Sequence, residues 1–136
     1  MVSYYKTVAN RLIEVDSLMP GCWISVVDPT AQERKMLIDD YGLDSDFLKS
    51  SLDEEESEQE ENQTLIIVDT AVSEVQKDDT LIFYTMPLGI ILTDHYVFTI
   101  SLRENKVIND VVSGRVRNIQ TQFRTQFVLR LMMNIT

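Results

Sequence analysis

Three strand-like segments follow one another between residues 64 and 102, and they restrict the folds open to this chain more than any other feature. The first, residues 64–69, contains the unbroken apolar run Leu-Ile-Ile-Val at positions 65–68. A strand of this kind has no polar side to turn toward solvent, which is typical of strands buried on both faces of a sheet. We therefore expect a sheet flanked by helices, which is an α/β fold.

The second and third segments are predicted to form a hairpin. Residues 81–93 are strand-like on both sides of Pro87, and Asp94 with His95 marks the tip. Because proline has no N–H to donate to a neighbouring strand, we expect an edge, a bulge or a change of strand at Pro87. Residues 96–102 return with alternating large apolar side chains, and a polar turn at residues 76–79 separates the hairpin from the first segment.

The first fifty residues predict further strands and two helices. Residues 4–15 alternate loosely, as one strand or an irregular hairpin, and residues 22–27 form a short buried strand. Thr30 and Glu33 have the spacing of a capping box, and Gly42 is suited to end the helix that they begin. Asp44 or Ser45 caps a second helix. Its apolar side consists of Phe47, Leu48, Ser51 and Leu52.

The apolar period changes from two to nearly four after residue 105. Residues 107–112 suit one helix, and a second helix is predicted from a stripe at i, i+4 spacing, which is either helix core or a face for a partner. The stripe consists of Ile119, Phe123, Phe127, Leu131 and Ile135. It meets no stop signal, so the chain is expected to be truncated within this helix. The expected fold is α/β (α+β), a mixed sheet of four to six strands flanked by helices, with Ile66, Val68 and Ile90 buried in it.

Charge is unevenly distributed along the chain, whose net charge is −10. Residues 53–61, here called the acidic segment, hold seven carboxylates, whereas residues 103–136 hold six Lys or Arg against two acids, a local charge of 6 − 2 = +4. The main body therefore lacks the basic surface that nucleic-acid binding requires. No stretch approaches the roughly 20 apolar residues of a membrane helix. A single cysteine, Cys22, fits a reducing cytoplasmic setting.

The acidic segment supplies the candidate metal ligands Asp53, Glu54, Glu55 and Glu56. Clustered carboxylates are the ligand type that hard cations such as Mg²⁺ prefer. The alternative is that the segment is an exposed, mobile loop whose charges only interact with solvent. The sequence leaves both interpretations open.

Residue patterns typical of enzymes are absent from the sequence. It has no nucleophile elbow, no phosphate-binding glycine loop and no cluster of His or Cys at metal-ligand spacing. His95, the only histidine, is a possible general base but is better interpreted as a solvated hairpin residue. Cys22 has no cation beside it and is expected in the core rather than as a reactive thiol. We predict that the chain is not an enzyme.

Several short motifs occur in a characteristic order. They are Trp23-Ile24-Ser25 followed by Asp28-Pro29-Thr30, then Tyr41-Gly42-Leu43, Phe47-Leu48-Lys49-Ser50-Ser51-Leu52-Asp53-Glu54-Glu55-Glu56, Thr64-Leu65-Ile66-Ile67-Val68-Asp69, Met86-Pro87-Leu88-Gly89-Ile90-Ile91-Leu92-Thr93 and Val97-Phe98-Thr99-Ile100. Together they resemble the N-terminal cytoplasmic domain of CorA-type magnesium/cobalt transporters, over roughly residues 5–136. The family's Gly-Met-Asn signature, which lies in its membrane part, does not occur in the chain.

The resemblance implies a regulatory domain over residues 1–105 and the start of a stalk helix over residues 106–136, truncated before the membrane helices. It implies a homopentamer in the cell (inner) membrane, with this part soluble on the cytoplasmic side and reaching the membrane only through the missing C-terminal part. Divalent cations, Mg²⁺ or Co²⁺, would be the transported or regulatory ions, none of them tightly bound. Bound between neighbouring subunits, they would hold the pore shut.

The family's regulatory acids align with Lys49 and Ser50, and neither side chain can hold a cation. The regulatory site is therefore expected at Asp53, Glu54 and the acids that follow, with Asp44, Asp46 and Asp69 as the next candidates. The function that the resemblance implies is the cytoplasmic portion of a CorA-like divalent-cation transporter that takes part in cation-dependent gating. The alternative is a stand-alone α/β interaction module whose acidic segment binds a basic partner.

Overall fold

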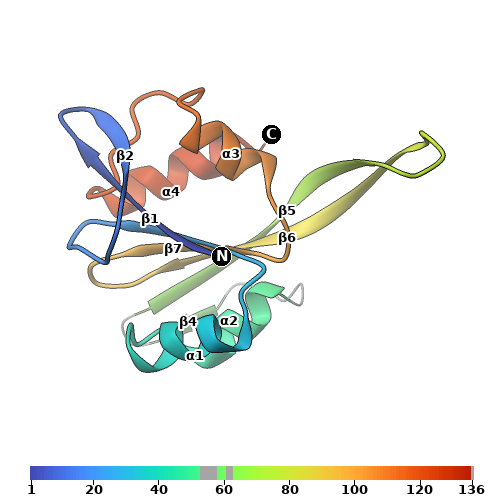
Figure 1. Ribbon diagram of the computed structural model, residues 1–136. Coiled ribbons are helices and arrows are strands. Elements are labelled where there is room, and N and C mark those ends of the chain that lie inside the picture. Colours follow the sequence, from blue (N-terminus) through green and yellow to red (C-terminus); the bar gives the residue numbers. More distant parts are fainter. Residues whose placement is uncertain (53–57, 61–62, 136) are drawn as a thin grey trace.

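Within residues 1–52, 58–60 and 63–135, which the computed structural model describes, seven strands form one mixed sheet and four helices cover it (Figure 1). The elements are β1 (Val2–Val8), β2 (Arg11–Val15), β3 (Trp23–Val27), α1 (Ala31–Asp39), α2 (Ser45–Leu52), β4 (Glu58–Glu60), β5 (Gln63–Val75), β6 (Leu81–Leu92), β7 (Val97–Ser101), α3 (Lys106–Val112) and α4 (Arg124–Met133). The predicted α/β fold with a mixed sheet is confirmed.

The strand order is β2-β1-β3-β7-β6-β5-β4, and of these neighbours only β3 and β7 run parallel. The sheet has one strand more than the expected maximum of six, because residues 58–60 pair with β5 instead of belonging to a loop. Glu58 instead pairs with Leu65, at the start of an antiparallel ladder along the sheet edge. The ladder satisfies backbone groups of β5, and charged residues are common on edge strands because they discourage pairing with further chains.

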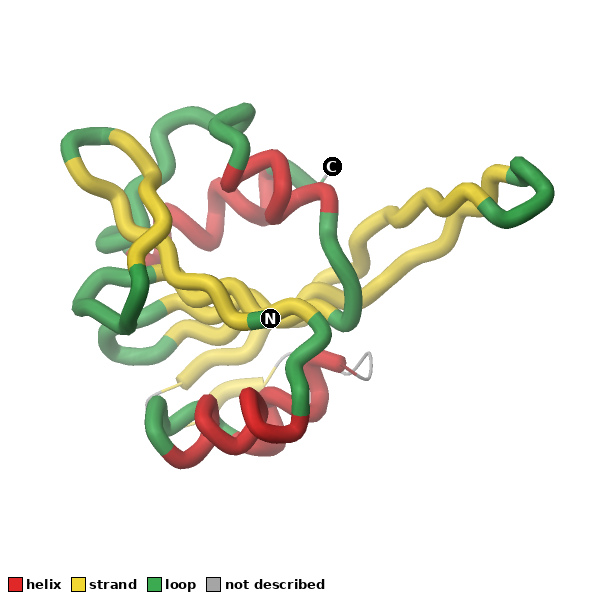
Figure 2. The backbone as a smooth tube through the Cα atoms, in the orientation of Figure 1, coloured by secondary structure: helices red, strands yellow, loops and turns green. Residues whose placement is uncertain are grey.

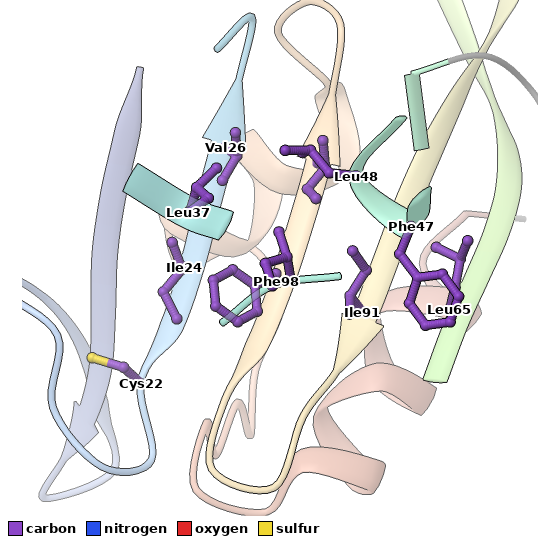
Figure 3. Packing of buried hydrophobic residues seen from close by; sticks show 11 residues of the cluster. Cys22, Ile24, Val26, Leu37, Phe47, Leu48, Leu65, Ile91 and Phe98 are labelled. Carbon is purple, nitrogen blue, oxygen red and sulfur yellow. The ribbon is translucent and has the colours of Figure 1, made fainter. Parts of the chain in front are cut away.

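The helices divide between the two faces of the sheet, so that the fold has three layers (Figure 1). Between the sheet and the helices α1 and α2, the core contains Cys22, Ile24, Val26, Leu37, Leu43, Phe47, Leu48, Leu65, Ile91, Phe98 and Ile100 (Figure 3). Under α3 and α4 it contains Trp23, Leu88, Ile90, Val97, Val107, Ile108, Val111, Ile119, Phe127, Val128 and Leu131. Adjacent strand residues thus point into different cores, as the pleat requires.

Burial on both faces is complete for residues 86–91 of β6 but only partial for β5. Ile90 and Ile91 are fully buried on opposite faces, and Leu65 is fully buried on β5. The expectation that Ile66 and Val68 are buried is wrong, since both are only half-buried. The reason is their position: β4 pairs only with residues 63–65, so at Ile66 and Val68 β5 is itself the edge of the sheet.

The strand β6 continues through Pro87 instead of breaking into two strands. Pro87 pairs with Asp69 of β5, whereas pairing with β7 begins only at Leu88. The proline therefore stands where β6 loses its second neighbour, which is the edge position predicted for it. Beyond this point β5 and β6 form a two-stranded projection, here called the arm (residues 69–87), which extends past the rest of the sheet (Figures 1 and 2).

The predicted C-terminal helix starts later than the apolar stripe suggested. The α4 helix begins at Arg124, so Ile119 and Phe123 precede it, and Phe123 is 54% exposed. A buried pair of threonines accounts for the difference: the Thr7 hydroxyl donates to the Ile119 carbonyl (2.9 Å), and the Thr7 N–H donates to the Thr121 hydroxyl (3.1 Å). Backbone polar groups of the connection are thereby bonded to β1 instead of to a helix.

The capping box predicted at Thr30 and Glu33 is present at the start of α1. The Glu33 N–H donates to the Thr30 hydroxyl (3.1 Å), and the Thr30 N–H donates to the Glu33 carboxylate (3.0 Å). The latter hydrogen bond is the main reason that the pKa of Glu33 lies below its usual value of 4.5.

The Thr30→Ala variant is expected to lose about 1 kcal/mol of stability, because the Glu33 N–H loses its acceptor. Urea denaturation at pH 7 measures this loss, with Thr125→Ala on the exposed side of α4 as the control. A Glu33 carboxylate with a lowered pKa stabilises the fold above pH 4.5, and this contribution disappears as the pH falls through the lowered value. An unchanged midpoint for Thr30→Ala would contradict the assignment.

Candidate functional site

The predicted metal ligands Asp53, Glu54, Glu55 and Glu56 lie outside the described residues. The structure does describe what precedes and follows them. The helix α2 ends at Leu52, and β4 begins at Glu58. The elements on either side of this segment, α2 and β4, therefore define the candidate site.

The helix α2 lies unusually close to the sheet, because Gly89 of β6 has no side chain. A Cβ atom placed on Gly89 would stand 2.1 Å from the Ser51 Oγ and 3.0 Å from the Ser51 Cα. Ser51 is fully buried, and its hydroxyl donates to the Phe47 carbonyl within the same helix (2.7 Å). The end of α2, one residue before the acidic segment, therefore has its backbone packed against the middle of β6.

The start of α2 is also fixed. The Asp44 carboxylate accepts hydrogen bonds from the N–H groups of Asp46 (2.9 Å) and Phe47 (3.1 Å), which confirms Asp44 as the cap. The Gln63 side chain then joins this turn to the first residue of β5. Its amide donates to the Gly42 carbonyl (2.8 Å) and its oxygen accepts from the Asp44 N–H (2.9 Å).

These contacts fix the helix before residues 53–57, and the strand after those residues is paired with β5. Residues 53–57 connect a helix packed on β6 to a strand paired with β5, and β5 and β6 are themselves neighbours. Neither Gly89 nor Gln63 is predicted from the sequence as a residue that supports this region. A glycine within a strand pattern is a recognised sign of close backbone approach, but Gln63 carries no comparable signal.

The other predicted ligands are not brought together. Lys49, whose positive charge would repel a cation, is exposed, and Ser50 is buried. Asp44 is occupied as a helix cap, and Asp46 and Asp69 are exposed. In the part of the chain that the structure describes, no three His, Cys, Asp or Glu residues form a group able to hold a metal ion.

The two residues considered for catalysis, His95 and Cys22, lie at the hairpin and in the core, as expected for structural residues. His95 is exposed at the hairpin between β6 and β7, and Cys22 is fully buried. Tyr4 and Tyr41 share a hydrogen bond of 2.6 Å between their hydroxyls, and burial followed by this bond raises the pKa of Tyr4 above its ordinary value. This pair joins β1 to the chain after α1.

An open groove of about 500 Å³ lies at the base of the arm, beside the end of α2. Its polar groups are already paired: Arg103 contacts the Glu74 carboxylate (3.6 Å) and donates to the Tyr84 hydroxyl (3.1 Å). Leu52, Met86 and Pro87 complete much of the lining. The described lining thus combines one ion pair and the polar residues Tyr84 and Thr85 with apolar side chains.

None of the helices within the described residues is long and apolar enough to cross a membrane. The family described as CorA-like Mg²⁺ transporter protein matches residues 21–136. No curated protein sequence shows significant similarity to the chain.

Solved structures with similar folds cover nearly the whole chain. The soluble domain of CorA from Methanocaldococcus jannaschii has a TM-score of 0.75 at 20% identity, covering 99% of this chain and 55% of that one. The complete CorA magnesium transporter from the same organism has a TM-score of 0.73 at 18% identity, with 99% and 44% coverage. The ZntB cytoplasmic domain from Vibrio parahaemolyticus has a TM-score of 0.70 at 8% identity, with 98% and 56% coverage. The chain thus spans about half the length of the structures it matches.

Proposed function

Because the chain belongs to the family of CorA-like Mg²⁺ transporter proteins, we propose that it is the cytoplasmic part of a divalent-cation transporter. The observation that carries the proposal is the family match over residues 21–136, together with a fold shared with the soluble domain of CorA. The family is one of transport proteins, and we propose no catalytic activity for the chain.

In this role the domain would take part in gating. Mg²⁺ or Co²⁺ would bind loosely between neighbouring copies in a homopentamer, using Asp53, Glu54, Glu55 and Glu56 as ligands. A cation that binds one arrangement of the copies better than another shifts the equilibrium toward that arrangement. The packing of α2 on Gly89 and the pairing of β4 with β5 support this role, because movement of ligands at residues 53–56 would be passed to α2 and to the sheet. Residues 106–136 would lead toward the membrane part.

A second candidate is an interaction module that binds a basic partner through the acidic segment. The net charge of −10 favours this candidate, since such a surface attracts any cationic molecule. The two candidates differ in selectivity. A cation site discriminates between divalent and monovalent ions at equal ionic strength, whereas a diffuse acidic surface responds mainly to ionic strength.

We expect Mg²⁺ and Co²⁺ to bind the 136-residue chain at roughly millimolar concentration, because Mg²⁺ sheds its waters reluctantly and one copy supplies few ligands. Calorimetric or NMR titration measures this binding. Replacing Asp53, Glu54, Glu55 and Glu56 by the corresponding amides should abolish it.

The matched control removes the same charge elsewhere, at Asp39, Asp40, Asp78 and Asp79, and should leave divalent binding nearly unchanged. Micromolar binding that survives neutralisation of residues 53–56 would place the site elsewhere. Equal weakening in both variants would favour the acidic interaction module.

A further inference from the structure

The arm exposes apolar side chains that nothing in the described part of the chain covers. Val75 is 66% exposed, Leu81 is 52% exposed and Phe83 is 75% exposed. The register pairs Val75 with Leu81 and Ser73 with Phe83, so these side chains lie on one face of the hairpin. Exposed apolar residues gathered on one face, unlike single scattered ones, are typical of interaction surfaces.

The charge of the arm restricts what can cover this face. Residues 69–87 hold Asp69, Glu74, Asp78 and Asp79 against Lys77, a net charge of 1 − 4 = −3. Two arms meeting each other would therefore repel. An anionic membrane surface would also repel the arm, since such surfaces attract basic segments. The suitable partner combines an apolar patch with positive charge.

The outer side of α4 has this combination. Leu129 is 53% exposed and Met133 is 69% exposed, and their spacing of four residues places them on the same side of the helix. Arg130 is exposed beside them and forms no ion pair with any residue that the structure describes. Arg103 pairs with the arm's own Glu74, and the remaining residues 104–136 hold five Lys or Arg against two acids, a charge of 5 − 2 = +3 that is opposite in sign to the arm.

We infer that the arm of one copy docks on the outer face of α4 of a second copy. The contact joins two different surfaces, so it is head-to-tail and each copy can both give and receive an arm. Contacts of this kind close into rings when the rotation between copies allows it. The inference goes beyond the proposed function, because it concerns the surfaces in contact and holds or fails whichever ion is transported.

Sedimentation of the 136-residue chain at low salt, up to millimolar concentration, tests the inference. The arm variant Leu81→Ser with Phe83→Ser, and the helix variant Leu129→Ser with Arg130→Glu, should each lower the association constant at least tenfold. A control variant, Val8→Ser with Ile13→Ser, changes apolar residues of similar exposure on the β1–β2 hairpin (48% and 42%) and should associate like the parent chain. Circular dichroism checks that each variant is folded.

A mixture of the arm variant and the helix variant gives a more decisive test than either variant alone. The arm variant keeps an intact α4 face and the helix variant keeps an intact arm, so an equimolar mixture should form dimers and nothing larger. A parent chain that stays monomeric at millimolar concentration overturns the inference. It is also overturned if either variant associates as the parent does, or if the mixture stays monomeric.

Discussion

The Trp23→Ala variant is expected to lose about 3–5 kcal/mol of unfolding free energy, which is a large part of the total stability of a domain of this size. Trp23 is fully buried on β3, in the core under α4. Its ring centroid lies 4.9 Å from that of Tyr5 and 5.1 Å from that of Phe127. One side chain thus holds together β1, β3 and α4, and its removal leaves a cavity between all three.

A hydrogen bond adds to this loss. The Trp23 indole N–H donates to the buried Thr99 hydroxyl at 2.8 Å. The alanine variant leaves this hydroxyl without its donor, whereas Trp23→Phe keeps most of the ring packing and loses mainly the hydrogen bond. Guanidinium denaturation followed by circular dichroism should therefore place Trp23→Phe between the parent and Trp23→Ala. A loss below about 1 kcal/mol in the alanine variant would show that this core does not depend on Trp23.

The Gly89→Ala variant is expected to lose about 3 kcal/mol, at the upper end of the usual cost of overpacking. The added methyl group would overlap both the side chain and the backbone of Ser51, so α2 would have to move as a whole. Denaturation midpoints measure the loss. The same displacement should also alter the proposed Mg²⁺ binding by the acidic segment, because α2 directly precedes that segment.

Two further variants separate packing from other causes. Gly114→Ala places a methyl group in open space at a φ of +85°, so it should cost only about 1 kcal/mol of backbone strain. Ser51→Gly removes the nearest atoms, and it should recover part of the stability when combined with Gly89→Ala. If Gly89→Ala is as stable as the parent chain, α2 does not pack on β6 as described.

Local signals in the sequence were sufficient for many features of the fold. The capping box at Thr30, the cap at Asp44, the hairpin at Asp94 and the edge position of Pro87 all depend on residues a few positions apart. Backbone geometry and hydrogen bonding between near neighbours decide such features, so residue types and their spacing are enough. The order of the motifs also identified the family that matches residues 21–136.

The remaining features of the fold depend on contacts between segments that are far apart in the sequence. The late start of α4 depends on Thr7, more than a hundred residues earlier in the chain, and the partial burial of Ile66 depends on the position of β5 near the sheet edge. The close packing of Ser51 on Gly89 and the link from Gln63 to Gly42 join segments that no periodic pattern relates. The acidic composition of residues 53–61 follows directly from the sequence. The packing of α2 on Gly89 and the pairing of β4 with β5, by contrast, exist only in the folded sheet. Long-range packing can override local propensity because burial and hydrogen bonding across the fold contribute more free energy than any single residue's preference.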